Sequence, residues 1–271
     1  MLTLAPVGDG RVTESPLVSA IIATRDRPRL LSIALSCYQR QTYSNRELIV
    51  VDDGDGAPAD AAAVEAAGGR LLRVEPGTPL GTKLNRGAAA ARGVFCQKMD
   101  DDDWYAPTFI ETMVANVLDS WAVICRPTVA VLMGFLFFDV ARWEVRRSTP
   151  ENAPGATLFF MRDRWEEHPF RGVPRDEDVW FYMDQLRHGG TCVTVDAPET
   201  FLAVRHSGSQ SDRGHTWTRQ LDGQRLETYM LDLPLYEGGP EALLPDWALP
   251  EYRALRRDMV AQAGPPERAE V

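Results

Sequence analysis

The chain has 271 residues, 44% of them hydrophobic and 25% charged, an ordinary globular composition that suits one large domain or two small ones. Its formal net charge of −10 argues against nucleic acid or an anionic membrane surface as the main partner. The four cysteines are far apart and form no paired motif, which argues against a disulfide framework or a zinc site and indicates reduced thiols.

The sequence predicts no segment that targets or crosses a membrane. Residues 1–16 lack a basic region followed by an apolar core, so we expect a flexible leader rather than a signal peptide. The most apolar run, Val129–Val140, is too short to span a bilayer and predicts a buried strand or hairpin. A soluble, cytoplasmic protein is therefore expected.

The first elements follow a β-α-β pattern. Leu17–Ala23 is an apolar run typical of a strand buried in a parallel sheet, and a polar turn and an amphipathic helix follow it. Glu47–Val51 is a second such strand and ends at Asp52 and Asp53. A unit of this kind has parallel strands and a right-handed crossover. Because ligands bind beyond the carboxyl ends of parallel strands, Asp53 is either a ligand contact or part of an Asp-Gly turn.

Further helices and strands alternate along the next fifty residues. A helix at 60–67 and a strand at 70–74 precede a loop that opens a third helix. Lys83 lies at the start of this helix, a position that suits a phosphate or a nucleotide, although a lysine taken alone also fits a solvated surface. A strand over Val94–Met99 then leads into an acidic run, Asp100–Asp103.

The acidic run places four carboxylates in consecutive positions. Two carboxylates about 6 Å apart repel by roughly 3 kcal/mol at an effective dielectric near 20, and a bound cation offsets such charge. In an extended segment Asp100 and Asp102 share one face, and Mg2+ and Mn2+ prefer oxygen ligands. We therefore expect a metal site at Asp100 and Asp102, and we interpret Asp103 as a cap of the helix that begins near Pro107.

The second half of the chain has a less regular pattern. We expect helices at 109–118, 175–188, 217–230 and 250–262, and strands at 121–125, 128–140, 143–147 and 155–160. Glu177 and Asp178 open the helix 175–188, where carboxylates either stabilise the helix dipole or act as a base. Asp176 is assigned to helix capping. The tail from Leu231 is expected to pack on the main domain or on a second subunit of a homodimer.

In order and spacing, several of these segments resemble the family 2 glycosyltransferases of the GT-A fold. The matching segments are Val18–Arg27, Glu47–Gly54, Lys83–Gly87 with Ala91–Gly93, and Met99–Pro107. The resemblance covers about residues 17–120 and continues more weakly to about 210. It implies an α/β, Rossmann-like domain with a mostly parallel central sheet flanked by helices. The single domain would span 17–230, with 17–105 as the nucleotide-binding half, 106–230 as the acceptor half, and 231–271 as a C-terminal extension.

The resemblance also implies roles for residues at the donor side. Thr24 and Asp53 would contact the nucleoside of a nucleotide-sugar, and Asp100 would contact the ribose or the metal. Asp102 would coordinate Mn2+ or Mg2+ on the diphosphate. The remaining donor contacts are assigned to Arg27, Lys83 and Asp101. Many family members have Arg directly before the Asn of the helix, where this chain has Leu84, so Lys83 is expected to substitute as a point charge.

On the acceptor side the resemblance implies a base and a closing loop. Asp178 would deprotonate the acceptor, and Glu177 would bind the acceptor or support the base. His206 is expected to complete the metal site, with His215 as its competitor. Either Arg205 or Arg213 would add positive charge next to the leaving group.

The function implied is a metal-dependent, inverting transfer of a sugar from a nucleotide-sugar, with a UDP-sugar favoured, to a small-molecule, glycan or peptide hydroxyl. One alternative, a nucleotidyltransferase on a related sheet, would need a glycine-rich phosphate loop after the first strand, and Thr24–Pro28 contains no glycine. A second alternative is a non-catalytic protein that binds sugar-nucleotides or glycans. The chain has no Gln-x-x-Arg-Trp element, which argues against a processive membrane synthase.

Overall fold

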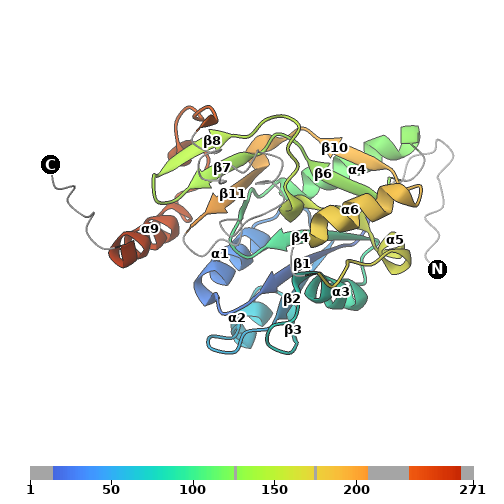
Figure 1. Ribbon diagram of the computed structural model, residues 1–271, viewed down its shortest axis with the longest axis horizontal. Coiled ribbons are helices and arrows are strands. Elements are labelled where there is room, and N and C mark those ends of the chain that lie inside the picture. The colour runs from blue at the N-terminus through green and yellow to red at the C-terminus, as the bar shows by residue number, and fades with distance from the viewer. Residues whose placement is uncertain (1–14, 125–126, 174–175, 207–231, 264–271) are drawn as a thin grey trace.

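The computed structural model describes residues 15–124, 127–173, 176–206 and 232–263 (Figure 1). The strands are β1 (Val18–Thr24), β2 (Arg46–Asp52), β3 (Gly69–Arg73), β4 (Phe95–Asp100), β5 (Trp104–Tyr105), β6 (Val129–Leu132), β7 (Leu136–Asp139), β8 (Glu144–Arg147), β9 (Phe159–Met161), β10 (Cys192–Val195) and β11 (Phe201–Arg205). The helices are α1 (Pro28–Gln39), α2 (Ala61–Ala66), α3 (Leu80–Ala90), α4 (Phe109–Ile124), α5 (Arg162–Glu167), α6 (Glu177–Arg187) and α9 (Leu249–Ala263), with short 3-10 helices η1 (Gly155–Thr157), η2 (Pro198–Thr200) and η4 (Pro240–Ala242).

Seven strands form the large sheet, in the order β10-β6-β9-β4-β1-β2-β3. Its pairs are parallel except for those of β9, which is antiparallel to both β4 and β6. This confirms the predicted α/β class with a mostly parallel central sheet. The register sets Ala23 of β1 opposite Asp100 of β4, and Thr24 opposite Asp52 of β2. The polar strand ends therefore meet at one edge of the sheet.

Helices cover both faces of this sheet because its strands are apolar on both sides. Ala20 and Ile22 of β1 belong to the same buried cluster as the apolar residues of α1, while Ile21 packs with Leu84 of α3 on the opposite face. The approach of α3 is close at Gly87, where an added methyl group would lie 2.5 Å from Ile21 Cγ2. The tight packing fixes α3, and with it Lys83, over the strand ends.

A second, four-stranded sheet has the order β5-β11-β7-β8 and lies beside the upper part of the large sheet in Figure 1. The prediction of one strand or hairpin over Val129–Val140 is therefore wrong, because β6 belongs to the large sheet and β7 to the small one. Gly134, at a φ of +65°, makes the turn between them. The strand predicted at 143–147 is present as β8 and pairs with β7.

Helix α4 extends beyond the helix predicted at 109–118. The strand predicted at 121–125 is wrong, since residues up to Ile124 continue α4. A short apolar run in a largely buried helix has the same composition as a buried strand, and periodicity alone does not separate them. The strand predicted at 155–160 begins later, at Phe159, after η1.

The C-terminal helix packs on the main domain. Tyr252 of α9 is fully buried, and its ring lies 5.4 Å from that of Phe138 on β7. Arg29 of α1 forms an ion pair with Asp258 of α9. The predicted helix at 250–262 is thus present, whereas the leader and the helix predicted at 217–230 lie outside the described residues, apart from Ser15 and Pro16. Homodimer formation stays a prediction.

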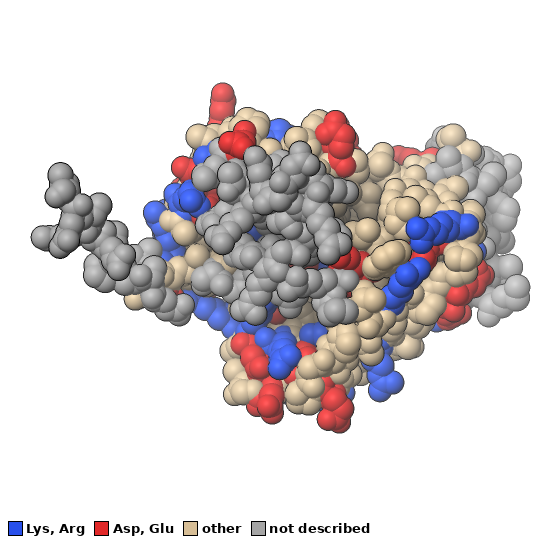
Figure 2. Space-filling model, viewed as in Figure 1, with Lys and Arg blue, Asp and Glu red and all other residues tan. Residues whose placement is uncertain are grey.

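None of the described helices has the length and apolar character needed to cross a membrane. On the face shown in Figure 2, acidic and basic side chains are interspersed at the lower end, where α2 and β3 lie. The excess of acidic residues is therefore not gathered into one patch there.

Candidate active site

A cavity of about 460 Å3 lies at the edge where β1, β2 and β4 end, bounded also by α6 and the small sheet. Almost all of the predicted site residues line it: Thr24, Arg27, Asp53, Lys83, Asp100, Asp101, Asp102, Glu177, Asp178 and Arg205. His206 contacts this group through Asp102, while His215 and Arg213 lie outside the described residues. Residues from distant parts of the sequence thus converge on one cavity.

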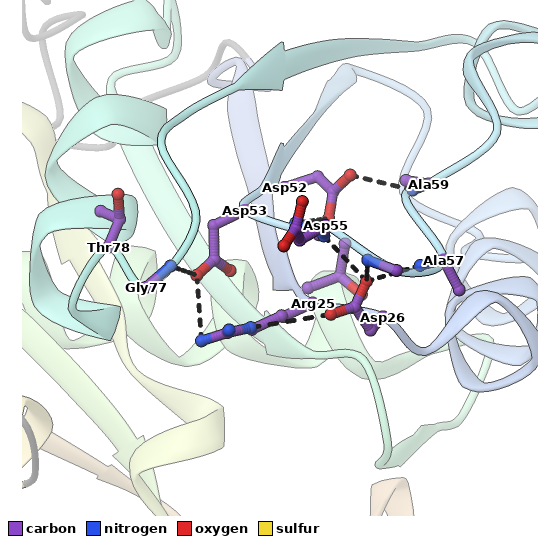
Figure 3. Close-up of polar contacts among 12 residues, drawn as sticks. Arg25, Asp26, Asp52, Asp53, Asp55, Ala57, Ala59, Gly77 and Thr78 are labelled. Carbon is purple, nitrogen blue, oxygen red and sulfur yellow. Dashed lines mark hydrogen bonds and ion pairs between the residues drawn. The ribbon is translucent and has the colours of Figure 1, made fainter.

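Asp53 and Lys83 form a buried pair at one end of the cavity. Lys83 Nζ lies 2.5 Å from Asp53 Oδ1 and donates a second hydrogen bond of 3.2 Å to the carbonyl of Thr24. The backbone N–H of Gly77 donates to Asp53 Oδ2 at 3.0 Å, and Arg25 Nη1 lies 3.8 Å from the same oxygen (Figure 3). Lys83 is therefore not a solvated surface lysine.

The turn after β2 is made by Asp52 rather than Asp53. Asp52 accepts hydrogen bonds from the backbone N–H groups of Gly54, at 2.8 Å, and Ala59, at 2.9 Å, and it pairs with Arg73. Asp53 is thus left to face the cavity. Asp26 accepts from the N–H groups of residues 55–57, and those bonds, led by that of Ala57, lower its pKa (Figure 3).

Residues Asp100–Asp103, here called the acidic tip, are the last residue of β4 and the turn that follows it, and several donors hold them. Thr24 Oγ1 donates to Asp101 Oδ2 at 2.6 Å. Arg27 Nη1 bridges Asp101 Oδ1, at 3.2 Å, and Asp102 Oδ2, at 3.1 Å. The loop after β1 therefore orders the acidic tip directly.

Asp103 is not a helix cap, contrary to our interpretation. Its Oδ1 accepts a 2.8 Å hydrogen bond from the backbone N–H of Val204 on β11, and α4 begins only at Phe109. Asp103 is buried, and burial together with the charge of Asp102 raises its pKa well above the usual value. A partner so distant in the chain gives no local sequence signal.

The acidic tip carries more negative charge than its neighbours balance. Burial and the charge of Asp102 raise the pKa of Asp101 to about 6. Burial also acts to raise the pKa of Asp102, but the hydrogen bond of His206, at 3.3 Å, and the charge of Arg27 outweigh it and lower the pKa to about 2. A cation bound here would favour the charged form of these carboxylates, against both burial and the charge of Asp102.

Three carboxylates of the acidic tip have the arrangement of a metal site. Asp100, Asp102 and Asp103 each offer one oxygen, and these atoms lie within 4.8 Å of one another. Carboxylate oxygens are the ligands that Mg2+ and Mn2+ prefer, so this donor set fits the predicted cation. Among the described residues, His206 is not part of this group, and Asp103 was not expected in it.

Glu177 and Asp178 form the first turn of α6. Glu177 is buried, and burial together with the charge of Asp178 raises its pKa to about 7. Asp178 Oδ1 accepts from the N–H of Val179 at 2.8 Å, and a methyl group added to Gly155 would lie 1.5 Å from Asp178 Oδ2. The absence of a side chain at Gly155 therefore makes room for the Asp178 carboxylate.

Asp176 occupies the N-cap position of α6, but its side chain makes no capping hydrogen bond, so that assignment is wrong. Its backbone is left-handed, with a φ of +61°, whereas a side-chain cap needs an extended backbone.

Asn85 of α3 joins the two sides of the cavity. Its Oδ1 accepts from Trp165 Nε1 at 2.8 Å and from the N–H of Phe170 at 2.9 Å, and its Nδ2 donates to the carbonyl of Phe170 at 2.8 Å. One amide thus ties the helix of Lys83 to the segment that leads into α6.

Sequence reasoning missed Lys98. This residue of β4 is 2% exposed, lines the cavity, and places its Nζ 2.7 Å from Asp100 Oδ1. A lysine in a predicted buried strand, two residues before the acidic run, was the available signal.

Comparisons with known sequences identify a family model and several relatives. Residues 19–168, more than half of the chain, match the family model described as Glycosyl transferase family 2. Putative glycosyltransferase EpsH of Bacillus subtilis is 33% identical over 117 residues, or 42% of this chain and 34% of that protein. The chain therefore spans about a third of EpsH. An uncharacterised protein of Mycobacterium tuberculosis, MT1568, is 24% identical over 93% of this chain and 87% of that protein.

Solved structures show the same fold. Mannosyltransferase PcManGT of Pyrobaculum calidifontis, in complex with GDP-Man and Mn2+, has a TM-score of 0.55 at 18% identity, covering 97% of this chain and 79% of that one. S. aureus TarS 1-349, in complex with UDP-GlcNAc, has a TM-score of 0.57 at 14% identity, covering 92% and 81%. The GT-A fold predicted from the sequence is therefore confirmed. The family model covers more than half of the chain, and this shows that the chain belongs to glycosyl transferase family 2.

Proposed function

We propose that this chain transfers a sugar from a nucleotide-sugar donor to an acceptor hydroxyl. One observation carries the proposal: a single cavity gathers the buried pair of Asp53 and Lys83, the acidic tip, and Asp178. The pair of Asp53 and Lys83 suits the nucleoside of the donor, the acidic tip suits its diphosphate, and Asp178 suits the acceptor hydroxyl. A protein that only bound a glycan would not need all three.

The nucleoside end of the donor is assigned to Asp53, Lys83 and Thr24. Asp53 is held by Lys83 and by the N–H of Gly77, so its carboxylate is ordered before any ligand binds. Proteins of this fold have been solved with UDP, with UDP-GlcNAc and with GDP-Man, which supports a nucleoside diphosphate sugar as donor. We favour a UDP-sugar.

The diphosphate is assigned to the acidic tip and the arginines beside it. Asp100 and Asp102 would hold Mn2+ or Mg2+, with Asp103 as a third oxygen ligand. When bound, such a cation neutralises charge that develops on the leaving diphosphate. Arg27 and Arg205 line the same cavity and add positive charge there. His206 supports the site by holding Asp102 rather than as a ligand of its own.

Asp178 is assigned as the base of a direct displacement with inversion. The acceptor O–H gives its proton to Asp178 while the oxygen forms a bond to the anomeric carbon, and the bond from that carbon to the diphosphate oxygen breaks. The N–H of Val179 fixes one oxygen of Asp178, and the space at Gly155 accommodates the other. Glu177, whose raised pKa keeps it partly protonated near neutral pH, would hydrogen-bond the acceptor.

A donor screen tests the proposal. Melting temperatures are measured with UDP-, GDP- and dTDP-sugars, with and without Mn2+, because a ligand that binds only the native state raises the melting temperature. Release of nucleoside diphosphate is then measured with small-molecule, glycan and peptide acceptors. We expect a metal-dependent shift and release with one donor class. A shift without release would favour a non-catalytic binding protein, and no shift with any donor would contradict the proposal.

A further inference from the structure

Lys98 is a buried ammonium on the cavity wall with unused hydrogen-bonding capacity. An ammonium carries three N–H donors. Within the described part of the chain, the one hydrogen-bond or ion-pair partner of this ammonium is Asp100, at 2.7 Å. The side chain is only 3% exposed, so little of it contacts bulk water. Buried donors normally have partners, and in a cavity wall these are water molecules or a ligand.

Lys98 lies in a cavity wall that also contains two groups of carboxylates. Its Nζ pairs with Asp100, and Glu177 and Asp178 line the same cavity. One group belongs to the acidic tip on β4 and the other to the first turn of α6.

The same two groups bracket the space in which a donor sugar must lie. In the proposed reaction the anomeric carbon is positioned between the diphosphate, at the acidic tip, and the base, at Asp178. Lys98 pairs with Asp100 on one side and lines the same cavity as Asp178 on the other. We propose that Lys98 donates a hydrogen bond to a hydroxyl of the donor sugar and is a specificity-determining residue for that sugar. This inference rests on the proposed function.

The test separates the sugar from the nucleotide. Affinities of wild type, Lys98→Met and Lys98→Gln are measured by calorimetry with Mn2+, using UDP and the UDP-sugar that the donor screen selects. A hydrogen bond to a charged group predicts a loss of about 10- to 100-fold in kcat/KM and in UDP-sugar affinity for Lys98→Met, with UDP affinity changed less than about threefold. Lys98→Gln keeps an N–H donor and should recover part of the loss. Melting temperatures check that each variant folds.

Two controls sharpen the result. Lys83→Met, at the nucleoside end, should weaken UDP and UDP-sugar equally. The second control is a donor that lacks the contacted hydroxyl. Wild type should bind this donor as weakly as Lys98→Met binds the parent donor. Lys98→Met should bind the two donors with equal affinity. Equal loss of UDP and UDP-sugar affinity in Lys98→Met, or unchanged affinities, would overturn the inference. Failure of wild type to bind any nucleotide-sugar would overturn the proposed function as well.

Discussion

Lys83 Nζ lies 2.5 Å from Asp53 Oδ1, and the two side chains are only 9% and 1% exposed. Removing one member leaves the other charge buried without its partner, which typically costs about 3 to 5 kcal/mol. Lys83→Met and Asp53→Asn should each lower the free energy of unfolding by an amount of this order. The double variant should lose less than the sum of the two, since it leaves neither charge behind. Denaturant titration measures all four proteins, and additive losses would contradict the coupling.

The acidic tip should determine metal use. Asp102→Asn removes one of three clustered carboxylates, and we expect activity to fall by about two or more orders of magnitude while the melting temperature stays within a few degrees. Mn2+ affinity, measured by calorimetry, should fall in parallel. Asp119→Asn, an exposed carboxylate on α4, is the matched control and should behave like wild type. Near-normal turnover of Asp102→Asn, or activity that survives EDTA, would remove the metal from the proposal.

Substitutions of Asp178 and Glu177 should change different kinetic parameters. Asp178→Asn removes the proposed base, and we expect transfer to fall by about 100- to 10,000-fold while donor affinity is kept. Glu177→Gln keeps the shape and hydrogen-bonding capacity of the protonated acid, so its main effect should be on the acceptor KM. Initial rates against donor and acceptor concentration distinguish the two patterns. If Glu177→Gln abolished transfer and Asp178→Asn did not, the base would be Glu177.

Glu177 also predicts a dependence of stability on pH. Its pKa is raised from 4.5 to about 7, so between these values the folded protein binds more protons than the unfolded chain. Stability contributed by this group is therefore present below about pH 4.5 and is lost as the pH rises through 7. Relative to Glu177→Gln, which mimics the protonated acid, wild type should lose on the order of 1 to 3 kcal/mol between pH 5 and pH 8. A constant difference across that range would contradict the assignment.

A side chain at Gly155 should lower kcat by displacing the Asp178 carboxylate. A methyl group at this position would lie 1.5 Å from Asp178 Oδ2, so Gly155→Ala must displace Asp178. We expect kcat to fall at least tenfold with donor affinity unchanged. Gly56→Ala is the control, because its nearest atom is Asp26 Oδ1 at 3.9 Å, and it should leave kcat unchanged. Equal kcat in the two variants would show that Asp178 does not need this position.

The donor half could be predicted from the sequence because its signals are local. The strand at Leu17–Ala23, the strand that precedes Asp52, and the helix of Lys83 are each defined by apolar periodicity and by a turn at their ends. The parallel β-α-β rule then places the strand ends together without further information. Asp53, Lys83 and the acidic tip accordingly lie in one cavity, as expected.

The remaining details depend on contacts between distant residues. Asp103 was assigned to a cap because the sequence does not reveal that Val204 lies beside it. The separation of β6 from β7 depends on one left-handed turn at Gly134, which in sequence is only a glycine in an apolar run. Lys98 was given no role, because the sequence does not show that its Nζ lies beside Asp100 in the wall of a cavity.

The antiparallel strand β9 has a consequence for how the chain can be divided. It lies between β4 and β6, so a strand from beyond residue 106 continues the sheet that residues 17–105 begin. A fragment that ended near residue 105 would leave the backbone groups of β4 open along one edge, and such edges recruit strands from other molecules. Limited proteolysis should accordingly yield no stable nucleotide-binding fragment, and the two halves should melt in a single transition.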